Sequence, residues 1–75
     1  MMFAADNCCV EVRPSEPGHS LPFHAMMLIQ HGIYLIENPK LEALAAARAC
    51  EFAFVVQPLK IKGGSGSAVA PIAIR

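Results

Sequence analysis

The sequence is poor in charge and in aromatic side chains. Only 16% of its 75 residues are charged, tryptophan is absent, and six basic and six acidic residues cancel to a net charge of zero. Because no basic stripe is present to hold phosphates, we expect no nucleic acid partner. Residues 21–36 lack full charges, but a stretch of this length is too short to cross a bilayer comfortably, so we also expect no membrane partner.

Cysteines are few and poorly spaced for disulfides. Cys8 and Cys9 are neighbours, Cys50 is the third, and no C-x-x-C spacing exists. This pattern favours reduced thiols that pack as small hydrophobic groups, and a metal or redox role is the less favoured alternative. In an alternating strand, Cys8 and Cys9 would point to opposite faces. The start of the chain carries Asp6 and no charged region ahead of an apolar run, so we expect no secretory leader and a cytoplasmic location.

Apolar residues, in contrast, are abundant for so short a chain. They make up 55% of the sequence, which we interpret as one domain or partial domain spanning residues 1–75. A chain of this length buries only about 60% of its unfolded surface, so much apolar surface is left over. Large exposed apolar patches are rare on monomers, which favours a homo-oligomer or a complex.

The pattern of apolar, proline and glycine residues predicts an α+β fold. We expect about four strands in a small mixed β-sheet, together with two helices. Ser20 would cap the first helix and Gly32 would end it in a left-handed conformation, while Asn38-Pro39 would open the second. The expected elements are a strand at 4–13, a loop at 14–18, a helix at 21–31, a buried strand at 33–36, a second helix that includes 41–48, a strand at 51–57 covered on both faces, and a last strand at 68–74 with Pro71 at an edge or bulge.

His24 and Glu37 are the residues most suited to chemistry. His24 lies in the first turn of the predicted helix, and Glu37 directly follows the next predicted strand. An imidazole and a carboxylate both bind divalent metals and both transfer protons near neutral pH. The alternative is a surface histidine and a solvated glutamate. His31 is two helical turns from His24, about 10 Å, which is too far to share one ion, so we expect it to interact with the helix dipole instead.

Several short motifs follow one another along the chain. An Asp…Val-Glu…Pro pattern comes first, followed by His-x-x-Met-Leu, Gly-Ile, Glu-Asn and Pro-Leu-Lys-Ile before a glycine-serine turn. This order of motifs resembles the C-terminal part of the metal-dependent cyclase family, which includes bacterial kynurenine formamidases. Each motif is loose by itself, but together they cover nearly the whole chain in the family's order. The matching segments are residues 5–14, 24–28, 32–38, 41–44, 52–54 and 58–67.

The resemblance implies a fold and an activity. It implies the C-terminal part of the cyclase-family fold, and a metal-dependent hydrolase of N-formyl or cyclic amides, of the arylformamidase type that serves tryptophan and kynurenine catabolism. His24 and Glu37 would be catalytic residues and ligands of a divalent zinc or manganese ion. The family's turn threonine is Ser65 here and its following proline is Ala68, and neither change touches these two residues.

The family's upstream His-x-Gly-Thr-His-x-Asp-x-Pro-x-His motif is absent from the sequence. Two ligands are too few for a tight metal site, so we expect the active site to be incomplete in this chain alone. A complementary N-terminal half, or further copies of the chain in a homo-oligomer, would be its partner. The alternative is a non-catalytic oligomeric binding or structural module derived from that family, which holds no metal.

Overall fold

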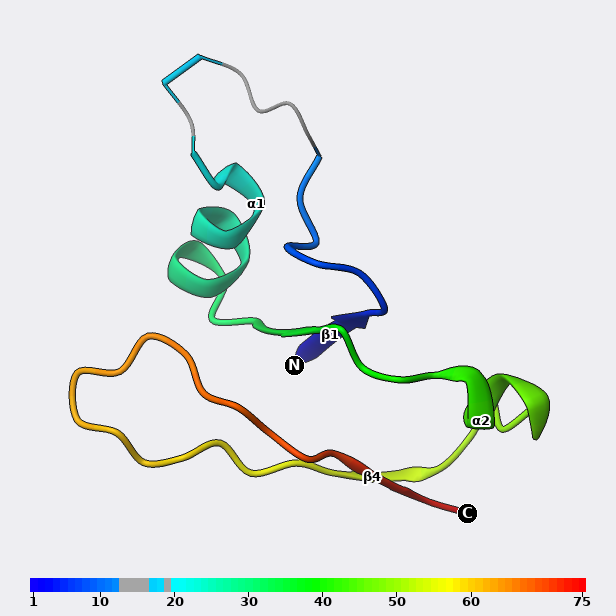
Figure 1. Cartoon of the computed structure of the whole chain (residues 1–75). Coiled ribbons are helices and arrows are strands. Elements are labelled where there is room, and N and C mark those ends of the chain that lie inside the picture. The colour runs from blue at the N-terminus through cyan, green and yellow to red at the C-terminus, as the bar shows by residue number, and fades with distance from the viewer. Residues whose placement is uncertain (13–16, 19) are drawn as a thin grey trace. The chain divides into compact units, whose positions relative to one another are not determined.

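The computed structural model describes residues 1–12, 17–18 and 20–75, which form two compact units. The first unit is Met1–Leu41 and the second is Glu42–Arg75 (Figure 1). Both units combine helical and extended segments, which confirms the α+β class. Among the described residues, no helix is both long and apolar enough to cross a membrane.

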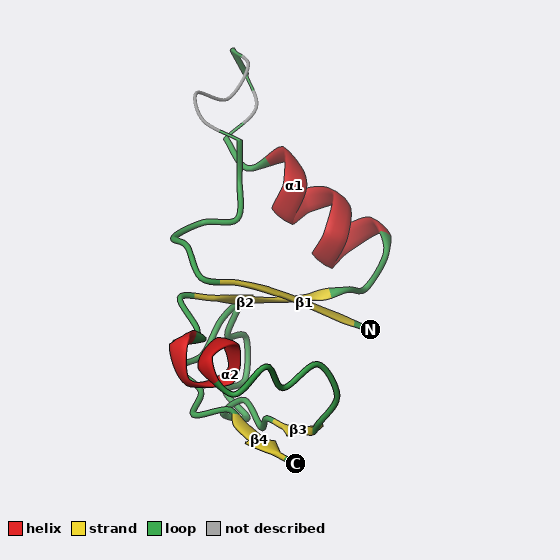
Figure 2. Cartoon of the chain, turned by 90° about the vertical axis from the view of Figure 1, so that its right-hand side faces the viewer, coloured by secondary structure: helices red, strands yellow, loops and turns green. Residues whose placement is uncertain are grey.

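The first unit is a strand–helix–strand arrangement. Strands β1 (Met2–Ala5) and β2 (Tyr34–Glu37) pair in parallel, with Met2 opposite Tyr34 and Ala5 opposite Glu37. Parallel strands require a long crossover, and here the crossover contains helix α1 (Pro22–His24), which continues directly as the π-helix η1 (Ala25–Gln30). Figure 2 shows this helical segment on one side of the strand pair.

Packing within the first unit is light. Ile36 of β2, 8% exposed, is the one hydrophobic residue among those described that is buried. An edge-to-face contact between Phe3 of β1 and Phe23 of α1, with ring centroids 6.0 Å apart, joins the helical segment to the strands. This aromatic contact adds to the burial of both rings and holds the start of the helix over β1.

The second unit consists of one short helix and one antiparallel strand pair. Helix α2 (Glu42–Ala46) precedes strand β3 (Ala53–Val55), which pairs with β4 (Ile72–Ile74). In the long connection between the strands, the Gly64 N–H donates to the Ile61 carbonyl at 3.1 Å, and the Leu59 N–H donates to Ser67 Oγ at 3.0 Å. These two bonds shape the glycine-serine loop from within.

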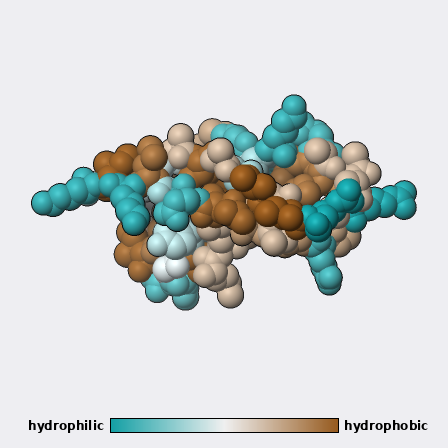
Figure 3. All heavy atoms as spheres, turned by 90° about the horizontal axis from the view of Figure 1, so that it is seen from below, coloured by the Kyte–Doolittle hydropathy of each residue, from teal (hydrophilic) through white to brown (hydrophobic). Residues whose placement is uncertain are grey.

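The structure corrects the predicted sheet. The described ranges contain four strands and two helical segments, but the strands form two separate two-stranded sheets, one parallel and one antiparallel, in place of one mixed sheet. The strand at 51–57 was predicted to be covered on both faces, and this is wrong. Its paired part is β3, where Phe54 is 44% and Val55 51% exposed. Hydrophobic residues at the surface are visible in Figure 3.

The first predicted strand also ends early. It was expected over residues 4–13, but β1 ends at Ala5. Cys9 and Val10 have positive φ angles of 73° and 30°, which an extended strand cannot contain. The expectation that Cys8 and Cys9 point to opposite faces is therefore wrong, and their sulfur atoms lie 3.1 Å apart.

The helix boundaries were partly predicted. Gly32 has a φ of 62°, which confirms the left-handed residue after the first helix. Ser20 does not cap that helix, because the N-cap is Leu21 and no side-chain capping bond is made there. Asn38 does not open the second helix. Its φ of 53° turns the chain after β2, and α2 begins only at Glu42.

The remaining boundaries concern the last strand and the first loop. The last strand is shorter than predicted and begins directly after Pro71, where a missing N–H costs the ladder nothing. The predicted loop at 14–18 falls mostly outside the described residues, as does His19.

Gly32 offers a test of the chain reversal between η1 and β2. A Gly32→Ala substitution places a Cβ on a left-handed residue, which costs about 1–2 kcal/mol even though the space beside it is open. We expect urea unfolding, followed by circular dichroism, to show a loss of stability of that size. Gly66→Ala is the matched control, because its site is equally open and its φ is not in the left-handed region. Equal stability of the two variants would contradict this account.

Candidate functional site

The site begins at the N-terminus of helix α1, where backbone N–H groups lack partners within the helix. Pro22 occupies the first turn and Leu21 supplies no capping side chain. The carboxylate of Glu11 accepts the Phe23 N–H at 3.1 Å through Oε2 and the His24 N–H at 2.8 Å through Oε1. Glu11 thus caps the N-terminus of this helix from a distant position in the sequence.

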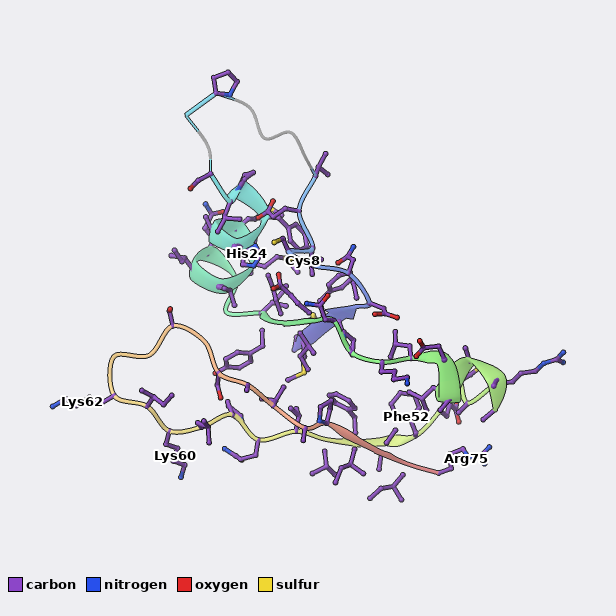
Figure 4. All side chains as sticks on the ribbon, in the orientation of Figure 1. Cys8, His24, Phe52, Lys60, Lys62 and Arg75 are labelled. Atoms are coloured by element: carbon purple, nitrogen blue, oxygen red, sulfur yellow. The ribbon has the colours of Figure 1, made fainter. Side chains whose placement is uncertain are left out.

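The same carboxylate also holds the His24 imidazole. Nδ1 of His24 lies 2.9 Å from Glu11 Oε1, and the Glu11 side chain is only 1% exposed. An ionised carboxylate only accepts hydrogen bonds, so Nδ1 must carry the proton in this contact. This assignment makes Nε2 the ring nitrogen available for chemistry. Figure 4 labels His24 on the helical segment.

Glu37 faces that second ring nitrogen. It is the last residue of β2, and its Oε1 lies 3.1 Å from His24 Nε2. The Oε1 atom is buried and makes no hydrogen bond, although the side chain as a whole is 32% exposed. Glu37 Oε1 and His24 Nε2 are therefore within ion-pair distance but do not form a hydrogen bond. A buried carboxylate oxygen left in this state carries a desolvation cost that a cation or a proton donor would relieve.

Two opposing effects act on the pKa of Glu11. Desolvation is the largest and would raise this pKa, but hydrogen bonds from the His24 N–H, the His24 ring and the Phe23 N–H, with the charge of His24, act together to lower it. The net result is a Glu11 pKa below its usual value of 4.5. Glu11 is consequently ionised at neutral pH and acts as a fixed negative group behind the imidazole.

The sequence predicted two of these three residues. His24 and Glu37 were selected by residue type and position, and the fold brings them together. His31 does not join them. It is the exposed C-cap of η1, and its N–H donates to the Met26 carbonyl at 3.1 Å. Glu11 was missed, since strand alternation assigned it to one face of a strand. The available signal was a carboxylate upstream of a helix whose own N-cap, Leu21, has no acceptor.

The arrangement can move a proton or hold part of a metal site. A carboxylate behind Nδ1 fixes the tautomer and the orientation of the ring, as in many histidines that act as bases or metal ligands. Within the described ranges, no group of three or more His, Cys, Asp or Glu side chains is arranged to hold a metal ion. His24 and Glu37 alone are fewer donors than a tight metal site takes.

Replacing Glu11 tests whether it organises the site. Glu11→Gln keeps the shape but puts an amide nitrogen near N–H donors that need acceptors. We expect a lower urea midpoint than the wild type and a shifted ring-proton spectrum of His24 by NMR. Glu51→Gln is the control, since Glu51 is an exposed residue outside the helices and strands. An unchanged His24 spectrum in Glu11→Gln would contradict the role given to Glu11.

The low pKa of Glu11 also predicts a pH dependence. A carboxyl group whose pKa is lower in the folded than in the unfolded state stabilises the fold fully above its usual value of 4.5. That contribution is lost as the pH falls through the folded-state pKa. The difference in thermal stability between the wild type and Glu11→Gln should therefore be largest at pH 7 and shrink as the pH falls below 4.5. A difference that is constant over this range would rule out the linkage.

The chain was also compared with known proteins. No protein-family model, curated protein or solved structure matches it.

Proposed function

We propose that the chain supplies His24 and Glu37 to a metal-dependent amide hydrolase of the arylformamidase type, as the C-terminal part of a cyclase-family protein. The observation that carries the proposal is the buried Glu37 Oε1, which faces His24 Nε2 at 3.1 Å without a hydrogen bond. A carboxylate oxygen and an imidazole nitrogen this close together are suited to a shared cation. The order of the sequence motifs is the second support.

The distances agree with this proposal. A nitrogen and an oxygen bound to one tetrahedral zinc ion lie about 3.3 Å apart, given metal–ligand bonds of about 2.0 Å. The observed separation of 3.1 Å needs little adjustment. Histidine ligands commonly donate their other ring N–H to a carboxylate, and Glu11 accepts from Nδ1 in this way. A bound zinc or manganese ion would supply Lewis acidity toward an amide carbonyl.

In the proposed reaction, the residues of this chain have distinct tasks. Glu11 holds the ring of His24 in the tautomer that exposes Nε2. Glu37 provides a negative oxygen beside Nε2, which can hold a cation or accept a proton. The peptide N–H groups at positions 23 and 24 help to keep Glu11 ionised, so a negative carboxylate stays beside the Nδ1 proton of His24.

In this proposal the remaining ligands lie outside the 75 residues, and the strands support a partner that would supply them. Parallel sheets are almost always buried on both faces and built from several strands, whereas β1 and β2 form a parallel pair of two. An isolated two-stranded ladder such as β3–β4 is also marginally stable in water. We propose a complementary half or a homo-oligomer as the source of the missing strands. We also propose a cytoplasmic location, which the small number and poor disulfide spacing of the cysteines support.

A second candidate function is a non-catalytic oligomeric module. It is favoured by the apolar residues that β3 and β4 leave at the surface, where Val55 is 51%, Ile72 57% and Ile74 55% exposed. Association through these residues would need neither metal nor catalysis. The two candidates differ in whether His24 binds a metal ion.

Metal titration separates them. Zinc or manganese is added to the purified chain, and binding is measured by calorimetry and by metal analysis after gel filtration. We expect binding that weakens at least about tenfold in His24→Ala and in Glu37→Gln, and about 10–100-fold in Glu11→Gln. His31→Ala is the control and should bind as the wild type does. Zinc that binds equally to the wild type and His24→Ala would contradict a site at His24.

Hydrolysis of an N-formyl aryl amide gives the second readout. Zinc-dependent hydrolysis that His24→Ala abolishes would support the hydrolase. Absence of zinc binding together with absence of hydrolysis would leave the non-catalytic module as the better proposal.

Association is tested separately by size-exclusion chromatography with light scattering. Exposed apolar strands predict a mass that is a multiple of 8.0 kDa. Exchanging an exposed residue of β4, in Ile72→Lys, should shift the population toward the monomer. A wild-type chain that remains a monomer at high concentration would contradict self-association.

A further inference from the structure

Cys8 and Cys9 form a pair of sulfur atoms that the proposed hydrolase does not use. Their Sγ atoms lie 3.1 Å apart, and neither residue is in a disulfide. Cys8 is exposed and Cys9 is partly exposed, so a small reagent in solvent can reach the pair. Figure 4 labels Cys8 on the segment that follows β1.

The backbone brings the two sulfurs together. In an extended strand, neighbouring side chains point to opposite faces, and the sulfurs would lie far apart. Cys9 instead has a φ of 73° and Val10 a φ of 30°, which turn the chain and put both thiols on the same side. Such conformations are costly for residues other than glycine, so the close approach is a property of the fold at this point.

An internal disulfide is a poor use of this pair. The Cα atoms of adjacent residues are at most about 3.8 Å apart. Disulfides usually join Cα atoms about 4.4–6.8 Å apart, and departures from this range store strain and make the bond easier to reduce. The reduced dithiol is therefore the favoured state in a reducing compartment, and it keeps two sulfurs ready to bind one atom.

A tetrahedral metal ion is also a poor fit. Two thiolates on one zinc ion lie about 3.8 Å apart, and a structural zinc site takes four protein ligands. In the part of the chain that the structure describes, no third His, Cys, Asp or Glu completes such a group. Two sulfurs this close together suit a three-coordinate atom that binds both of them and carries one other group.

We propose that Cys8 and Cys9 form a vicinal dithiol site for trivalent organic arsenicals. An arsenoxide, R–As=O, reacts with both thiols: two As–S bonds form, the bond to oxygen breaks, and the two thiol protons leave with that oxygen as water. Arsenic stays trivalent and sulfur is not oxidised, so no oxidant or reductant is needed. The first As–S bond makes the second an intramolecular step, which raises its effective concentration to the millimolar range or above.

Phenylarsine oxide is the probe, and Cys50 gives the matched control. Cys50 is also an exposed, reduced thiol, but its Sγ lies near the Arg48 carbonyl at 3.6 Å and has no cysteine beside it in sequence. The reduced chain is mixed with the probe, and the adduct is measured by intact mass spectrometry. We expect one arsenical per chain, retained in excess monothiol and removed by 2,3-dimercaptopropanol.

Single substitutions then locate the adduct. Cys8→Ser and Cys9→Ser should each reduce the monothiol-resistant adduct at least tenfold, while Cys50→Ser should retain it. Proteolytic mapping of the wild-type adduct is the measurement that does not depend on a variant, and it should place both As–S bonds on the peptide that contains residues 8–9. An adduct that monothiol removes, or one that Cys50→Ser abolishes, would overturn the proposal.

Discussion

The first unit depends on one carboxylate. Glu11 accepts two backbone N–H groups at the start of α1 and the Nδ1 proton of His24, so a single side chain begins the helix, orients the imidazole and links the segment after β1 to the helix. Its oxygens are almost completely buried, which makes each of these bonds strong and each loss costly. The position of His24 relative to Glu37 therefore depends on a residue that need not contact a substrate or a metal.

The His24–Glu37 pair lies entirely within the first unit. His24 belongs to α1 and Glu37 to β2, so both elements that hold the pair are in this unit. Within the described residues, β1 and β2 form a sheet of only two strands. In the function proposed above, a chain added beside this parallel pair would bring both further strands and further ligands.

Residue type and position were enough to select His24 and Glu37, because few side chains in this sequence can bind a metal or transfer a proton. Gly32 was predictable for a similar reason, since glycine adopts a left-handed φ at little cost. Glu11 and the end of β1 were not predictable. They depend on positive φ angles at Cys9 and Val10, residues whose local preferences favour an extended strand, so that tertiary contacts decide their conformation. Asn38 is an intermediate case, because asparagine both caps helices and accepts left-handed geometry.

The register of the parallel pair bears on how the molecule folds. Every partnered position in β1 and β2 is separated by 32 residues, as Tyr34 is from Met2. Such a pairing stabilises the chain only after the entropy of closing a long loop has been lost. Contacts of this separation therefore slow folding relative to local ones. Glu37 lies beside His24 only when β2 is in register with β1, and the imidazole is oriented only when Glu11 reaches the start of α1. Both neighbours of the ring are distant in sequence, so the environment of His24 reports on completion of the first unit.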